Sequence, residues 1–224
     1  MEEAFLQHLL ENSPMTFPAS SLQWQTHPAL SNVSTLHQLL GEDACLPVDH
    51  RKDGVSTRRT MKFKDFVEKI GHKDQNESYY AKDVHILQIS QSPPCEFPAL
   101  FQDDWMDSYY RYNYQGKDDY TFLYIGGPNS WTGLHFDVLC SYSVSYNLLG
   151  RKLWKLWSPS LRFHDCDASL SYDTMPSLEM ERMVSTVILQ ETGETVFVPS
   201  GWYHTVQNLD PCVISINKNW YITG

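Results

Sequence analysis

A histidine and an aspartate two positions apart, His135 and Asp137, are the first residues in this sequence that could perform chemistry. They lie in the run LHFDVL, which is typical of a β-strand, and side chains two apart in a strand project from the same face. A metal ion could therefore bind both. The same residue types recur at His72 and Asp74 in the polar stretch GHKDQNES, so the spacing alone predicts little.

His204 is the third candidate ligand. It follows an expected tight turn at 199–201, which separates two β-rich runs and would hold the histidine at the end of a hairpin. Two imidazoles and one carboxylate are the ligand set of non-haem Fe(II) oxygenases, which leaves positions open for cosubstrate and oxygen. The same set suits a zinc ion with a catalytic water. The ligand types do not distinguish iron from zinc. They are also compatible with no metal at all, in which case His135 and His204 would be buried structural histidines.

Composition and charge exclude several classes of protein. The 224 residues include 17 Lys and Arg against 27 Asp and Glu, and the net charge of −10 opposes binding to nucleic acid. Hydrophobic residues make up 42% of the chain, which excludes a disordered protein. No apolar run reaches the ~20 residues of a membrane span, and the N-terminus is acidic where a signal peptide is basic. We therefore expect a cytoplasmic protein without a membrane partner.

The elements that must position the candidate ligands change in type along the chain. Helical spacing of apolar residues predicts helices over 5–10, 34–40 and 62–70. After about residue 80, short β-rich runs are divided by Gly, Pro and Asn. The expected strands are 84–89, 121–125, 134–139, 143–149, 153–157, 184–189, 194–198, 203–206 and 213–217. Strands without intervening helices predict an antiparallel architecture.

The expected fold is mainly β, a jelly-roll or cupin barrel (double-stranded β-helix) with an N-terminal helical cap. Among antiparallel folds that hide their sheet edges, this barrel offers a mouth wide enough for a ligand. We assign residues 1–80 to the cap and residues 81–224 to the barrel. No repeat, linker or low-complexity tract separates the two, so we expect one integrated domain.

The order of motifs along nearly the whole chain resembles the jumonji-C oxygenases. Thr132 precedes the His-x-Asp pair by three residues, and GRKLW, VPSGWYHTVQNLD and SINKNW follow in that order. The stretches QDDWMDSYY and DDYTFLYIGGPNSW are most similar to the jumonji domain-containing protein four group, which are cytoplasmic lysyl hydroxylases. The resemblance implies Fe(II) bound by His135, Asp137 and His204, with 2-oxoglutarate as cosubstrate and O₂ as oxidant.

The resemblance also implies a pocket for the cosubstrate. Lys152 would bind the distal carboxylate of 2-oxoglutarate, with Thr132 as a hydroxyl partner. Further expected pocket residues carry hydroxyl or amide groups: Tyr80, for which Tyr79 is the alternative, Asn217 and Asn219. Without the resemblance, Lys152 would be interpreted as an exposed hairpin residue.

The activity that the resemblance implies is hydroxylation of a lysine in a protein, with the translation termination release factor as the expected partner. Asp137 favours hydroxylation, because many histone demethylases of the family carry Glu in its place. A lysine or arginine demethylase, an inactive barrel that binds a partner protein, and a zinc cupin are the alternatives. The acidic, aromatic stretch 103–120 would recruit a basic segment, or would be a solvated face with its aromatic side chains packed inward.

Two expectations concern the surroundings of the barrel. Relatives usually continue into C-terminal helices that form a homodimer and part of the substrate groove, and without them the barrel edge near Trp220 and Tyr221 would be uncovered. Trp131, Tyr146 and Trp202 would wall the pocket or pack in the core.

Overall fold

The computed structural model describes residues 1–71, 76–114, 120–161 and 175–222. One sheet consists of β1 (Met15–Phe17), β3 (Cys45–Lys52), β4 (Val55–Lys62), β5 (Glu77–His85), β7 (Thr121–Gly126), β9 (Tyr142–Leu149), β12 (Thr195–Val198) and β14 (Val213–Trp220). A second sheet consists of β8 (Trp131–His135), β10 (Lys152–Trp157), β11 (Thr186–Gln190) and β13 (Tyr203–Asn208). The short strands β2 (Gln25–Thr26) and β6 (Cys95–Glu96) form a separate pair.

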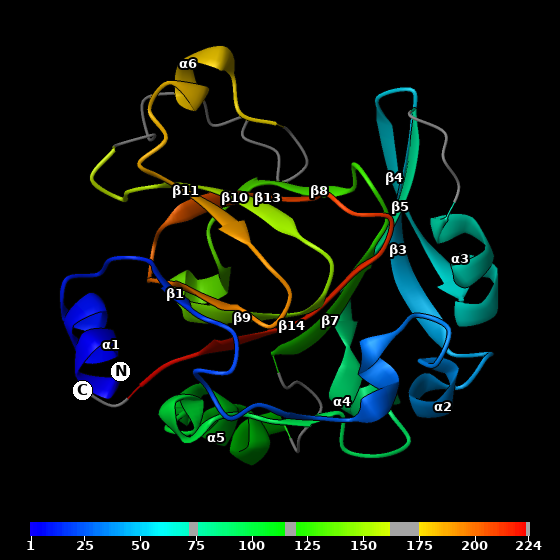
Figure 1. Cartoon of the computed structure of the whole chain (residues 1–224), viewed down its shortest axis with the longest axis horizontal. Helices are drawn as coiled ribbons and strands as arrows, with labels where there is room; N and C mark the ends of the chain where they lie inside the picture. The colour runs from blue at the N-terminus through cyan, green and yellow to red at the C-terminus, as the bar shows by residue number, and fades with distance from the viewer. Residues whose placement is uncertain (72–75, 115–119, 162–174, 223–224) are drawn as a thin grey trace.

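The two larger sheets face each other and form the barrel (Figure 1). The strand orders are β1-β12-β9-β14-β7-β5-β3-β4 and β11-β10-β13-β8, and every described pair is antiparallel. This architecture confirms the predicted jelly-roll fold. No helix in the described ranges is long and apolar enough to cross a membrane.

Helices lie around the outside of the barrel (Figure 1). They are α1 (Glu2–Leu10), α2 (His37–Leu40), α3 (Phe63–Ile70), α4 (Ile86–Ile89), α5 (Trp105–Tyr114) and α6 (Leu178–Glu181), with 3₁₀ turns η1 (Pro28–Ser31), η2 (Ala99–Phe101) and η3 (Val138–Cys140). α3 begins and ends within one residue of the predicted helix. α5 lies on the outer side of the large sheet, next to β14 (Figure 1).

The main apolar cores lie on the outer face of the large sheet, so the barrel interior can remain polar. On β14, Ile216 packs in the largest outer core and Trp220 in an aromatic one, whereas Asn217 and Asn219 line the interior. This alternation follows from the strand period of two. The aromatic core contains Phe5, Phe17, Phe101, Val144, Phe197 and Trp220. Each such side chain contributes about 1.5–3 kcal/mol through burial.

Three expected elements differ from the structure. The predicted strand 84–89 is the end of β5 followed by helix α4, and the predicted strand 134–139 stops at His135. The first 80 residues carry β1, β3 and β4 besides the expected helices, and all three strands join the large sheet. The β3–β4 hairpin turns at Asp53 and Gly54, whose φ values of 49° and 79° are those that an Asp-Gly turn provides.

The expected open edge at the end of the barrel is also wrong. β14 lies between β9 and β7 in the middle of the large sheet, so it has no free edge. Trp220 is fully buried in the aromatic core. The position of a strand in a sheet depends on long-range pairing, which its place at the end of the sequence does not reveal.

Candidate metal centre

Three side chains from β8, β13 and the segment after β8 meet in the barrel interior. His135 is the last residue of β8 and pairs with His204 near the start of β13. The candidate ligand atoms of His135, Asp137 and His204 all lie within 4.8 Å of one another. The two imidazole centroids are 4.2 Å apart. The structure therefore brings together the three residues that the sequence analysis selected.

Asp137 reaches this site by a different route from the predicted one. β8 ends at His135, so strand alternation does not place the aspartate. Its backbone is extended, with φ −66° and ψ 150°, and η3 begins at the next residue. Ser143 on β9 donates a hydrogen bond of 2.6 Å to Oδ2 of Asp137. This contact orients the carboxylate, as hydrogen bonds from outside a ligand set do at metal sites.

Backbone carbonyls orient both imidazoles. Nδ1 of His135 lies 2.8 Å from the carbonyl oxygen of Gly133, and Nδ1 of His204 lies 3.2 Å from that of Trp202. Because a carbonyl only accepts, Nδ1 carries the proton in each contact and Nε2 keeps a lone pair for a metal. Burial, together with the nearby His204, lowers the pKa of His135 to about 4. His135 is therefore neutral at pH 7, as a metal ligand must be.

Lys152, the first residue of β10, is a cation enclosed in the same cavity. Its side chain is 2% exposed, and the amine donates a hydrogen bond to Oγ of Ser215. Burial lowers the pKa of Lys152 to about 7. Among the described residues it has no carboxylate partner, and a buried charge without a partner is costly. An anionic ligand would supply the missing charge.

The remaining predicted pocket residues line this cavity: Tyr80, Thr132, Asn217 and Asn219. Tyr80 is enclosed and interacts with Thr132, and burial raises the pKa of its hydroxyl. Tyr79 points to the other face of β5, where its ring stacks on His50 and its hydroxyl donates to Glu77. Strand alternation thus favours Tyr80 over Tyr79.

The two asparagines are held by neighbouring hydroxyl groups. Oδ1 of Asn217 accepts hydrogen bonds from Ser145 at 2.9 Å and from Ser215 at 3.2 Å. Asn219 donates to Oγ of Ser141 at 3.1 Å. Because the oxygen of Asn217 is occupied, its amide NH₂ remains as a donor toward a ligand.

The sequence analysis missed several residues of the cavity lining: Tyr124, Ser143, Trp154 and Val206. Tyr124 is partly buried and donates a hydrogen bond of 2.8 Å to Asp83, and burial raises the pKa of its hydroxyl. The alternation of β7 and β9 could have identified Tyr124 and Ser143, because the intervening Leu123 and Val144 pack in the outer cores.

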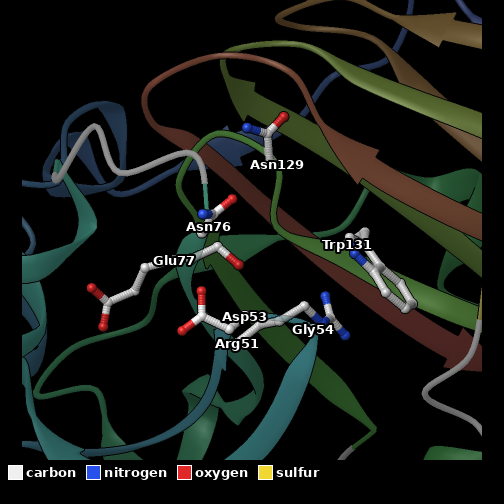
Figure 2. Close-up of a pocket in the computed structure, with 8 residues that line it drawn as sticks. Arg51, Asp53, Gly54, Asn76, Glu77, Asn129 and Trp131 are labelled. Atoms are coloured by element: carbon white, nitrogen blue, oxygen red, sulfur yellow. The ribbon is translucent and has the colours of Figure 1, made fainter.

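Trp131, Tyr146 and Trp202 were expected to wall the pocket or to pack in the core, and Trp202 does pack in a core. Tyr146 stacks on Trp24, with ring centroids 4.5 Å apart, and Trp202 packs in an apolar cluster between the sheets. Trp131 lies at a second pocket, with the guanidinium carbon of Arg51 3.5 Å from its ring centroid. Figure 2 shows the Arg51 side chain directed toward Trp131 and the Glu77 carboxylate directed away from it. None of the three lines the metal cavity.

The family model for the cupin-like domain matches residues 3–223. The chain belongs to the cupin-like family. This cupin-like chain is 34% identical to the 2-oxoglutarate and iron-dependent oxygenase JMJD4 of Gallus gallus, over 96% of the chain and 56% of that protein. It is 32% identical to the protein of the same name from Danio rerio, over 96% of the chain and 57% of that protein. The arginine-specific demethylase JMJ20 of Arabidopsis thaliana is 34% identical to the chain, over 77% of the chain and 42% of that protein. The chain thus spans little more than half the length of the JMJD4 relatives.

Proposed function

We propose that this chain is an Fe(II)- and 2-oxoglutarate-dependent oxygenase. The observation that carries the proposal is the enclosed Lys152, which lies without a carboxylate partner in the cavity that also contains the two histidines and the aspartate. A metal-bound dicarboxylate needs both a metal and a cation deeper in the barrel. A zinc hydrolase or an inactive barrel would have no use for the cation, which is why we favour the oxygenase over those alternatives.

In this proposal, His135, Asp137 and His204 hold Fe(II), and Lys152 binds the distal carboxylate of 2-oxoglutarate with Thr132 and Tyr80 as hydroxyl partners. When bound, iron and 2-oxoglutarate supply the oxidising chemistry that lets O₂ hydroxylate a C–H bond. The side chains of this chain position and orient the reactants and exclude water, and none has to act as a nucleophile. Ser143 keeps the Asp137 carboxylate in place. The oxygen of Asn217 accepts from Ser145, so its amide NH₂ would be the group that donates to a bound ligand.

We further propose that the substrate is a lysine in a cytoplasmic protein, with the translation termination factor as the first candidate. The resemblance of residues 102–110 and 118–131 to lysyl hydroxylases supports this choice, and the net charge of −10 suits a basic substrate. Arginine demethylation is the second candidate, because one relative carries that name. Formaldehyde release would indicate demethylation, whereas a stable gain of one oxygen atom would indicate hydroxylation.

The first experiment is an anaerobic titration of the purified chain with Fe(II) and 2-oxoglutarate. We expect a visible metal-to-ligand charge-transfer band that needs both additions. His135→Ala should abolish the band, and His37→Ala, which removes an exposed histidine, should keep it. A folded, metal-loaded sample without the band would rule out the oxygenase site.

A further inference from the structure

A series of ring contacts runs from the surface of α5 into the metal cavity. The centroid distances are 6.3 Å for Trp105–Tyr109, 5.5 Å for Tyr109–Tyr110, 4.8 Å for Tyr110–Tyr120, 6.2 Å for Tyr120–Phe122 and 6.5 Å for Phe122–Tyr124. We name these six residues the aromatic rim. At its inner end, Tyr124 lines the metal cavity, and at its outer end Trp105 and Tyr109 are each 47% exposed.

A second apolar surface begins directly after Asp137. Val138 and Leu139 in η3 are 51% and 62% exposed. Leu139 has a φ of 57° and Cys140 a φ of 54°, which are unfavourable for these residue types. Tyr221 donates a hydrogen bond to the carbonyl of Leu139, so this turn contacts the residue that follows β14. Exposed aliphatic side chains on a strained backbone, next to a candidate metal ligand, point to a binding function.

Tyr221 joins the two surfaces. Besides its bond to Leu139, its ring lies 5.8 Å from that of Trp105, and its carbonyl accepts a 3.1 Å hydrogen bond from the Trp105 backbone N–H. The aromatic rim and the aliphatic turn are therefore one surface, and both of its ends reach the metal cavity through Tyr124 and Asp137.

The outer end of the rim is anchored to the strand that lines the cavity. Asp104 precedes α5, and its Oδ1 accepts a hydrogen bond from the backbone N–H of Asp107. Its Oδ2 lies 2.9 Å from the amine of Lys218 in a mostly buried ion pair. Lys218 lies between Asn217 and Asn219 on β14, so α5 is attached directly behind the cavity lining.

The charge around this surface indicates the chemistry of its partner. Asp103 and Asp107 flank the exposed end of the rim, and the whole chain has a net charge of −10. The faces of tyrosine and tryptophan rings attract cationic side chains, and the aliphatic turn suits apolar ones. We propose that the surface binds a segment of the protein substrate in which basic and apolar residues flank the target residue. The identity of that segment as substrate rests on the proposed function.

The test measures peptide binding to the full chain by fluorescence anisotropy. One labelled peptide has a central lysine flanked by arginine and leucine, and its matched partner has glutamate and serine in their place. We expect the basic peptide to bind more tightly, and added salt to weaken its binding. The double variant Trp105→Ala/Tyr109→Ala should weaken binding about tenfold or more, as loss of aromatic anchors does at interfaces. Leu178→Ala, at a side chain 85% exposed on α6, is the matched control.

Equal binding of the two peptides, or wild-type affinity in the double variant, would overturn the inference. A second result would also overturn it: the wild-type chain is a dimer, the double variant is a monomer, and both bind the peptide equally. The rim would then bind a second copy of the chain. Leu139→Asn provides an independent variant, since asparagine tolerates a positive φ, and it should weaken binding too. Peptide binding needs neither iron nor turnover. A loss of peptide binding would therefore contradict this inference alone, whereas a missing charge-transfer band would contradict the proposed function.

Discussion

Burial determines the charge state of the residues that matter most. His135 is neutral at pH 7 because burial and His204 oppose its protonation, with a pKa of about 4. Lys152 has a pKa of about 7 because burial opposes its charged form. Each state suits a ligand: a neutral imidazole for a metal and a lysine that gains its full charge when a carboxylate binds.

The depressed pKa of Lys152 predicts a pH-dependent stability. Since its ordinary value is about 10.4, the unfolded chain binds more protons than the folded one between about pH 7 and pH 10.4, and stability rises with pH in that window. From pH 7 to pH 9 this lysine should add about 2 kcal/mol to the free energy of unfolding. Lys152→Met should lose that gain. Urea unfolding at both pH values measures it, and equal pH dependence in the two proteins would contradict the prediction.

At the scale of elements, turns and strand ends place the cavity. β8 stops at His135, and the extended backbone at Asp137 then returns the carboxylate to the histidines. β7 stops at Gly126, which pairs with Tyr80 on β5. There the Asn208 side chain from the small sheet packs against the strand end. This contact joins the two sheets beside Tyr80.

Gly126 is expected to tolerate no larger residue. A Cβ there would overlap Nδ2 of Asn208 and lie 2.5 Å from Oγ of Ser130. Gly126→Ala should therefore destabilise the protein by about 1–3 kcal/mol, the usual cost of overpacking. Gly71→Ala, where the added carbon would meet no atom within 4 Å, is the control. Calorimetric melting compares them, and equal melting temperatures would show that the strand end is not tightly packed.

At the scale of the whole molecule, helices outside the barrel are attached to strands whose other face lines the cavity. The Lys218–Asp104 pair is the clearest attachment, with exposed side-chain fractions of 11% and 4%. The pair links α5 to the middle of the large sheet, and thus the proposed substrate surface to the candidate metal centre.

Removal of one partner of this pair should be costly. Asp104→Ala leaves a buried lysine unpaired, so we expect a loss of about 3–5 kcal/mol in the free energy of unfolding. Adding Lys218→Met should recover much of it, because no charge then remains buried. The exposed Lys62–Asp43 pair is the control, and Asp43→Ala should change stability little. Chemical denaturation of the four proteins tests this, and a cost for Asp104→Ala no larger than for Asp43→Ala would refute it.

The sequence by itself determined the family, the barrel and the three candidate ligands, because the motifs, their order and the turn residues can be identified along the chain without knowledge of strand pairing. The sequence analysis did not identify the Asp-Gly turn of the β3–β4 hairpin, because the charged, exposed β4 lacks the alternation that reveals a strand. The roles of the site residues remain predictions that the titration tests.

Only the tertiary structure decided where each of these residues lies. It placed Lys152 inside the barrel, Trp131 outside it, and Trp220 in the middle of the large sheet. It also joined the rim on α5 to the turn after Asp137 through Tyr221. The physical reason is that burial and contact depend on which strands pair across large sequence distances, and local patterns carry no record of that pairing.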